Sequence, residues 1–128
     1  MRNSKQLSRG DGTKKSGWGW KVFRGSRDKL CGMFYTPSGI DFFEGNRSRP
    51  YAKDKWHRHK KDSPGFCLFT KIENAERYRS MFPDTVIVRV RYRGALTSGS
   101  VDGIRHAITA AEIFIPSTAT ENQTKKTR

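Results

Sequence analysis

The strictest folding constraint in this sequence is the alternation of apolar and charged residues between Thr85 and Arg93. Successive side chains of a β-strand point to opposite faces, so such alternation predicts a strand with one buried and one solvated face. The apolar face, which must belong to the core, carries Val86, Val88, Val90 and Tyr92. The other face carries Ile87, Arg89, Arg91 and Arg93. Beyond it, residues 95–97 are expected to continue the strand through a β-bulge.

Four further segments have the patterns of strands. Trp18–Arg24 alternates bulky apolar residues with others, Gly25–Asp28 has turn composition, and Lys29–Tyr35 returns, which predicts an antiparallel hairpin. Phe66–Phe69 is a brief apolar run, typical of a buried strand. Ile104–Ile115 ends in alternating isoleucines, which favours a last strand over a helix.

One helix is expected between the Phe66–Phe69 and Thr85–Arg93 strands. Apolar residues recur at helical spacing from Ile72 to Phe82, and Pro83 ends the segment. Thr70 and Glu73 have the spacing of a capping box, in which the hydroxyl accepts a helix amide and the carboxylate reaches back. The pattern therefore predicts a helix with a side-chain cap at its start.

Together these elements predict an α+β fold, with a β-rich, mostly antiparallel sheet, one central helix and one long basic loop. Eight Phe, four Tyr and three Trp supply enough apolar area for one modest core. We assign a single domain to residues 18–116. Residues 1–17 and 117–128 hold few large apolar groups, so we expect them to be disordered basic tails.

Positive charge dominates the composition. The chain has 26 Lys and Arg against 12 Asp and Glu, a formal net charge of +14. Seven basic residues crowd one segment in which Asp54 is the sole acid, namely Arg47, Arg49, Lys53, Lys55, Arg58, Lys60 and Lys61. Charges this dense repel one another, so the segment gains free energy from a polyanion that displaces its counterions. This favours a phosphate-rich partner.

Two features extend this expectation to nucleic acid. Arg89, Arg91 and Arg93 stand about 6.5–7 Å apart on one strand face and form a cationic stripe. Tyr51 and Trp56 lie within the basic segment, where an aromatic ring is able to stack on an unpaired base while lysines and arginines contact phosphates. The predicted interface therefore comprises the seven basic residues, the two aromatics and the stripe, with RNA, DNA or a ribonucleoprotein as the partner.

Catalytic and metal-binding patterns are weak by comparison. The chain has no phosphate-gripping Gly-rich loop, no Gly-x-Ser-x-Gly elbow and no close carboxylate pair. His57 and His59 form a His-x-His pair that is chemically suited to a metal-free nuclease, but histidines among basic residues are more often part of an anion-binding face. We therefore expect a non-enzymatic protein with no cofactor.

Zinc ligands of the right types are present but badly spaced. Cys31, Cys67 and His106 are spread singly, without the short Cys or His knuckles that fix zinc geometry. We expect no metal, and both cysteines as small buried core residues. Two cysteines do not form a disulfide scaffold, and no apolar run is long enough for a membrane helix or a signal peptide. These features favour a cytoplasmic protein.

The order of several short motifs resembles a group of small phage- and prophage-encoded proteins. The motifs are Trp-Lys-Val-Phe at 20–23, Gly-Phe-Cys-Leu-Phe-Thr at 65–70, Asn-Ala-Glu at 74–76, the valine-rich strand at 86–94, Gly-Ile-Arg-His-Ala at 103–107 and Ala-Glu-Ile at 111–113. Those proteins share a Gly-Phe-x-x-Phe step before a helix. This chain has Cys67 where that group often has His, and His106 interrupts its Arg-Ala. The resemblance implies an α+β fold and a viral or mobile-element origin, with the host cytoplasm as the location if the protein is viral, and it implies no activity.

Two alternatives belong to other functional classes. One is a phage-type inhibitor whose basic surface grips an acidic patch on a host protein. The other is a small transferase that modifies nucleotides or proteins in a cleft between glycine-flanked strands, although Glu112 has no second acid close by in the sequence.

Overall fold

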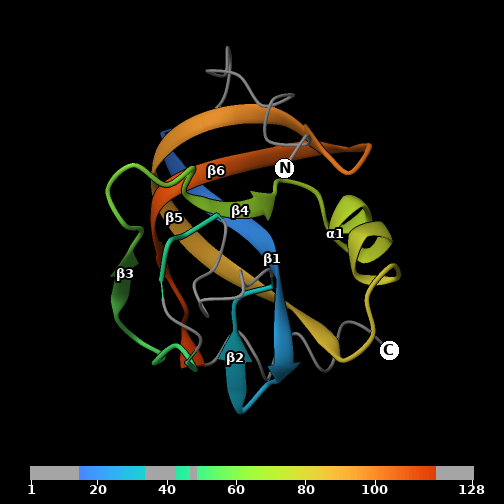
Figure 1. The fold of residues 1–128 in the computed structure, drawn as a ribbon, viewed down its shortest axis with the longest axis horizontal. Coiled ribbons are helices and arrows are strands. Elements are labelled where there is room, and N and C mark those ends of the chain that lie inside the picture. The colour runs from blue at the N-terminus through green and yellow to red at the C-terminus, as the bar shows by residue number, and fades with distance from the viewer. Residues whose placement is uncertain (1–14, 34–42, 47–48, 118–128) are drawn as a thin grey trace.

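The computed structural model describes residues 15–33, 43–46 and 49–117 (Figure 1). These ranges contain six strands and one α-helix. In chain order they are β1 (Ser16–Ser26), β2 (Lys29–Cys31), β3 (Trp56–Arg58), β4 (Phe66–Phe69), α1 (Ile72–Arg79), β5 (Thr85–Val101) and β6 (Ile104–Phe114). The predicted β-rich, antiparallel architecture with one helix is confirmed.

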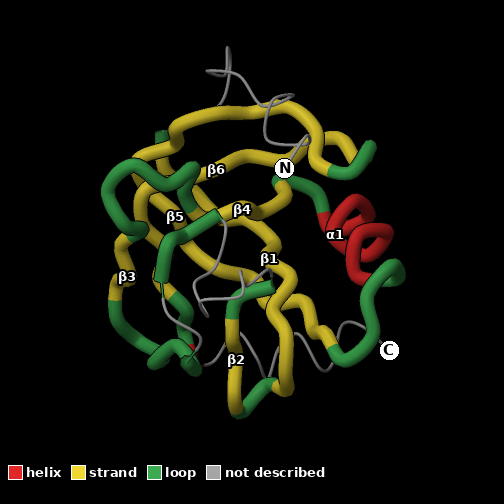
Figure 2. The backbone as a smooth tube through the Cα atoms, viewed as in Figure 1, coloured by secondary structure: helices red, strands yellow, loops and turns green. Residues whose placement is uncertain are grey.

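The strand pairing closes on itself. β1 pairs with β5, β5 with β6 and β6 with β4, and β4 returns to β1 where Trp20 faces Phe69. Every one of these pairings is antiparallel, and the long strands curve around a common centre (Figures 1 and 2). β2 extends the edge of β1, and β3 extends the edge of β6. The result is a small barrel, a closure that leaves few unpaired strand edges.

The barrel interior is filled by side chains from all sides of this circuit. The predicted core face of β5 is confirmed, since Val88 and Val90 are fully buried and Tyr92 is nearly so. They pack with Phe23, Leu30, Phe66, Leu68, Ile108, Ala110, Ile113 and Ile115. Burial of this aliphatic and aromatic surface is the main favourable term in the stability of the barrel.

The helix covers one part of the outer surface and forms a second core there. Ala75 and Tyr78 of α1 pack on Ile87, which explains why this residue of the arginine-bearing face is buried. The rest of the second core comprises Val22, Phe43, Phe69, Val101, Ile104 and Ala107. α1 is therefore a lid on one side of the barrel and not a central element.

The predicted helix ends need correction. The N-cap is Lys71, which makes no side-chain cap hydrogen bond, and the Thr70 hydroxyl donates to the His106 carbonyl instead. The capping-box prediction was therefore wrong, because the cross-strand acceptor engages the hydroxyl. The helix ends at Arg79. Phe82 lies in the turn that follows, and its ring packs on Tyr78. A proline disfavours helical backbone at the residue before it, so the last predicted turn is lost.

The strand boundaries differ from the predictions at several places. β5 continues to Val101 through irregular register at residues 95–97, as the bulge prediction expected, and again near residue 99. The predicted last strand is confirmed as β6. The hairpin is also confirmed, although its second strand ends at Cys31. Residues 34–42 and the chain ends at 1–14 and 118–128 lie outside the described residues, and β1 begins at Ser16, inside the segment assigned to the N-terminal tail.

The alternation of β1 places small and charged residues inside the barrel and indoles outside. Lys21 faces Val88 in the register and is buried, whereas Trp18 on the opposite face is 45% exposed. Gly19 leaves space for Leu68, because a β-carbon at Gly19 would collide with that side chain. The tryptophans of β1 therefore lie outside the barrel interior, Trp20 packed against the second core and Trp18 exposed for other contacts.

Candidate functional site

Three arginines and three tryptophans alternate in one row on the outer wall of the barrel. Across the β1–β5 pairing, Trp20 faces Arg89 and Trp18 faces Arg91. Trp56 of β3 reaches the same face because β3 and β5 both pair with β6. We call this set the Arg–Trp row, and it comprises Trp20, Arg89, Trp18, Arg91, Trp56 and Arg93.

Each guanidinium of the row lies over an indole. Arg93 is the closest, with its Cζ 3.9 Å from the centroid of Trp56. Arg89 lies 4.6 Å from Trp18, and Arg91 lies between Trp18 at 5.9 Å and Trp56 at 5.8 Å. At these distances the quadrupole of the ring attracts the cation, worth about 0.5–1 kcal/mol at an exposed site. The arginines are therefore held in place without losing their charge.

One carboxylate neutralises only part of this face. Glu112 accepts from Arg93 and, at 3.1 Å, from Arg58 of β3. The hydrogen bond from Arg93 is the main reason why the pKa of Glu112 lies below its ordinary value. Within the described ranges, neither Arg89 nor Arg91 pairs with a carboxylate. These two exposed arginines are the uncompensated cations of the Arg–Trp row.

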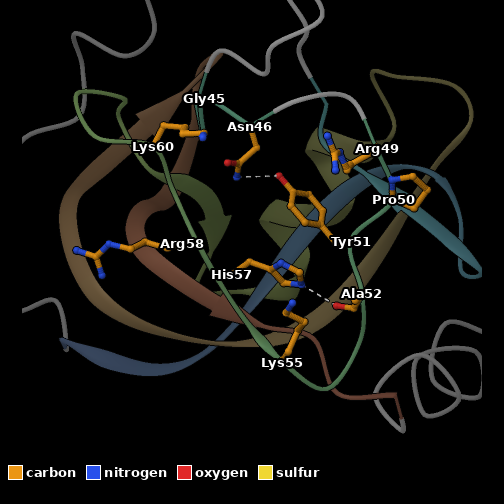
Figure 3. A pocket seen from close by; sticks show the side chains of 10 residues that line it. All are labelled: Gly45, Asn46, Arg49, Pro50, Tyr51, Ala52, Lys55, His57, Arg58 and Lys60. Atoms are coloured by element: carbon orange, nitrogen blue, oxygen red, sulfur yellow. Dashed lines mark hydrogen bonds between the residues drawn. The ribbon is translucent and has the colours of Figure 1, made fainter.

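The basic segment also forms a pocket on the other side of β3, with a volume of about 630 Å³ (Figure 3). Tyr51 and His57 stand at its centre, with ring centroids 4.9 Å apart. The remaining lining residues are Gly45, Asn46, Arg49, Pro50, Ala52, Lys55, Arg58 and Lys60. His57 Nε2 lies 2.7 Å from the Ala52 carbonyl, which fixes the ring against the segment leading into β3.

A buried polar network lies beneath this pocket. The Tyr51 hydroxyl donates to Glu44, whose side chain is 1% exposed and forms a 3.0 Å ion pair with Lys21. Lys21 Nζ also lies 5.2 Å from the centroid of Phe23 and 3.3 Å from the Cys67 carbonyl. The network therefore extends from the interior wall of β1 to the pocket floor, and burial excludes water from its charged members.

Backbone hydrogen bonds hold the pocket walls. The backbone N–H of Lys60 donates to the backbone carbonyl of Glu44, and the backbone N–H of Tyr51 donates to the backbone carbonyl of Leu30 in β2. Gly45 has φ +73°, and a β-carbon there would lie 2.7 Å from the Cβ of Lys60. Glycine thus permits the chain after Glu44 to pass directly against the opposite wall.

The structure divides the predicted interface into two surfaces. Trp56 joins the face of Arg89, Arg91 and Arg93, and Arg58 borders both surfaces, since it pairs with Glu112 beside Arg93 and also lines the pocket. Arg49, Tyr51, Lys55 and Lys60 line the pocket. Lys53 and Lys61 belong to neither surface, and Arg47 lies outside the described residues.

Tyr51 is less available for base stacking than expected. Its ring packs against the barrel core, with Phe66 at 6.1 Å, and its hydroxyl is engaged by Glu44. Trp18, which sequence reasoning did not select, is the exposed indole of the row. Trp18 and Trp20 are two residues apart, as Arg89 and Arg91 are, so both pairs were expected to lie on one face of a strand. This shared period of two was the sequence signal for the row.

The described residues include every cysteine and histidine of the chain. Among them, no three His, Cys, Asp or Glu side chains come together as a metal-binding group. Cys31 and Cys67 form no disulfide and are only half-buried, which corrects the expectation that both are buried in the core. Both lie at the margin of the packed interior, where Cys67 contacts the second core. In the same part of the chain, no helix combines the length and hydrophobicity required to span a bilayer.

Comparison of the chain with protein-family models, curated proteins and solved structures gives no match. The resemblance to phage-encoded proteins therefore stays a prediction, and the case for a function depends on the geometry of the two surfaces.

Proposed function

We propose that the protein is a non-enzymatic binder of single-stranded nucleic acid, RNA or DNA, and that the strand lies along the Arg–Trp row. The observation that carries this proposal is the alternation of three guanidiniums with indoles on one outer wall, where two of the guanidiniums, those of Arg89 and Arg91, pair with no carboxylate of the described residues. Single-strand binders combine cations that follow the phosphates with aromatic rings on which bases stack. The row supplies both groups at the spacing of alternate strand residues, about 6.5–7 Å, which is close to the phosphate spacing of an extended strand.

The contacts within the row support binding because they reduce its entropic cost. A free arginine side chain loses rotamer entropy when it contacts a phosphate, about 0.5–1.5 kcal/mol for each immobilised side chain. Arg89 and Arg91 are already ordered against Trp18 and keep their charge. An incoming phosphate therefore meets cations that are partly preorganised.

Exposure of Trp18 favours single strands over duplexes. An indole that is 45% exposed offers area for a base to stack on, and only an unpaired base is able to reach it. Stacking on an aromatic side chain is worth about 1–3 kcal/mol per base. A duplex would use the charge of the row but not this ring.

The test is fluorescence anisotropy with labelled oligo(dT), oligo(U) and a matched DNA duplex, at several salt concentrations. We expect the single strands to bind more tightly, and Trp18→Ala to weaken single-strand binding by roughly tenfold and duplex binding by clearly less, since the duplex loses only the ordering of the arginines. Phe82→Ala, at a half-buried aromatic beside α1, is the matched control. Absence of binding at low salt refutes the proposal.

A host protein with an acidic patch is the other partner of suitable chemistry. Pull-down from a lysate treated with nuclease separates the two partners. Retention of a specific protein, together with failure of every oligonucleotide to bind, would replace nucleic acid with an acidic protein surface.

A further inference from the structure

The pocket beside β3 is positively charged. Among the described residues that line it, four are Lys or Arg and none is acidic. Arg58 turns away from the centre toward Glu112, whereas Arg49, Lys55 and Lys60 approach the pocket from different sides (Figure 3). These three side chains are exposed at the rim, and no carboxylate in the described ranges pairs with them. The rim is therefore suited to an anion with several oxygens, such as a phosphate.

The floor of the pocket is polar and held by hydrogen bonds, in contrast to its exposed cationic rim. Asn46 Nδ2 donates to the Tyr51 oxygen at 3.3 Å, and the Tyr51 hydroxyl donates to Glu44. In this arrangement the carbonyl oxygen of Asn46 is left to accept a hydrogen bond, and no hydrogen bond of the described residues uses it. An amide oxygen selects a ligand that carries a donor, such as a sugar hydroxyl.

The ion pair beneath the floor indicates that this polarity is built into the fold. Removing Lys21 and Glu44 from water is costly, and an apolar pair of similar volume is often at least as stable. Glu44 directly precedes two pocket residues, Gly45 and Asn46, and its carboxylate orients Tyr51. The buried pair thus fixes the floor, which a purely structural core residue would not need to do.

The volume of the pocket excludes inorganic phosphate as the whole ligand. About 630 Å³ lies within the usual range of about 300–1,000 Å³ for small-molecule pockets, and a free phosphate would fill only a small part of it. A ligand that spans the distance from rim to floor must join a phosphate to a larger body with hydroxyl groups.

We propose that this pocket binds a nucleoside phosphate monoester. The phosphate lies among Arg49, Lys55 and Lys60, and a sugar hydroxyl donates to the amide oxygen of Asn46. The edges of Tyr51 and His57 border the sugar and base. The same chemical group is present in a free nucleotide and at the 5′-phosphorylated end of a strand.

This site is separate from the Arg–Trp row. On β3, Trp56 points to the outer wall and His57 faces the pocket, because alternate residues of a strand lie on opposite faces, and Arg58 borders both surfaces, since it lines the pocket and pairs with Glu112. Nucleotide binding therefore does not depend on Trp18, Arg89 or Arg91, and substitutions of these residues should leave the pocket intact.

The experiment is isothermal titration of the full chain with AMP, ribose 5-phosphate, inorganic phosphate and adenosine. We expect AMP to bind most tightly, ribose 5-phosphate next and inorganic phosphate at least tenfold more weakly, with no binding of adenosine. Lys55→Gln/Lys60→Gln should weaken AMP binding by roughly tenfold or more, since each change removes a charge-assisted hydrogen bond. The matched control is Lys29→Gln/Lys71→Gln, which removes the same charge at exposed positions outside the pocket.

Asn46→Asp supplies a second test that keeps side-chain size and adds an anion to the floor. It should abolish AMP binding while single-strand binding of the row changes less than twofold. Equal affinity for phosphate and AMP, binding of adenosine, or equal effects of the lysine pair and its control would each overturn the proposal.

A 5′-phosphorylated trinucleotide and its 5′-hydroxyl counterpart identify the source of the ligand. Tighter binding of the phosphorylated trinucleotide than of AMP assigns the pocket to strand ends, and tighter binding of AMP assigns it to free nucleotides. Both results support the pocket. Failure of the Arg–Trp row to bind oligo(dT) leaves them unaffected, so the two proposals fail independently.

Discussion

Neutralising Arg89 and Arg91 together tests the proposed interface most directly. They are the two arginines of the row that no carboxylate of the described residues compensates, whereas Arg93 contacts Glu112. If each contacts one phosphate of a single strand, Arg89→Gln/Arg91→Gln should make the log–log salt slope less steep by about 1.4, or about 0.7 for each contact.

The same slope gives the expected loss of affinity. With the affinity at about 1 M salt unchanged, a slope difference of about 1.4 corresponds to roughly 14-fold weaker binding at about 0.15 M salt. At about 0.05 M salt it corresponds to roughly 65-fold. The loss should therefore grow as salt is lowered, which distinguishes missing phosphate contacts from a general loss of folded protein.

The assay is anisotropy of labelled oligo(dT) between these two salt concentrations, with thermal unfolding to verify the fold. Arg77→Gln/Arg105→Gln is the control, because it removes the same charge from exposed positions on α1 and near the start of β6. If the control flattens the slope as much as the test pair, net charge and not the Arg–Trp row binds the strand, and the reasoning is refuted.

Three further perturbations test other parts of the argument. Glu112→Gln releases two guanidiniums, so oligo(dT) binding should tighten by roughly threefold to tenfold at about 0.1 M salt; weaker binding would mean that Glu112 positions those groups. Because its folded pKa lies below the ordinary value of 4.5, ionised Glu112 stabilises the fold above that pH and less as pH falls through the folded pKa; acid titration of stability should be shallower in the variant. Lys21→Met should cost about 3–5 kcal/mol in urea unfolding by leaving Glu44 unpaired, and Lys21→Met/Glu44→Gln should recover part of this; equal losses would contradict the ion-pair argument. Gly45→Ala should lower stability by about 1–3 kcal/mol because of its positive φ and the crowding with Lys60, and an unchanged melting temperature would contradict that reading.

Local pattern was sufficient to predict most of the elements. The alternation in Thr85–Arg93 requires one buried face, and β5 has it. The run Phe66–Phe69 is apolar throughout, and β4 is covered on both sides by the two cores. In these segments the burial of side chains and the period of the backbone favour the same structure.

Barrel closure and the pocket depend on contacts that no local pattern specifies. The return of β4 to β1 is made where Trp20 faces Phe69, residues far apart in the sequence. The ion pair joins Lys21 to Glu44, and the sequence around either residue does not predict the other as its partner. The sequence offered one hint, a lysine between apolar neighbours in a strand, which occupies a core-facing position.

The division of the basic segment has the same origin. Its charge predicts an anion partner, but charge does not specify the face to which each side chain points. β3 pairs with β6 for only three residues, and that short pairing places Trp56 on the outer wall and His57 in the pocket, with Arg58 at the border of the two. The separation into two surfaces therefore follows from strand register and not from composition.

The alternation of β1, with a lysine inside the barrel and indoles outside, determines where this strand tolerates insertions and deletions. Adjacent residues of this strand point to opposite faces of the sheet, with Trp20 outside the barrel and Lys21 inside. Deletion of a single residue ahead of them would exchange the two sides, forcing an indole into the interior and an ammonium group into solvent. Length variation should consequently accumulate in the turn at Arg27–Asp28, which absorbs an extra residue without shifting the phase of the strand.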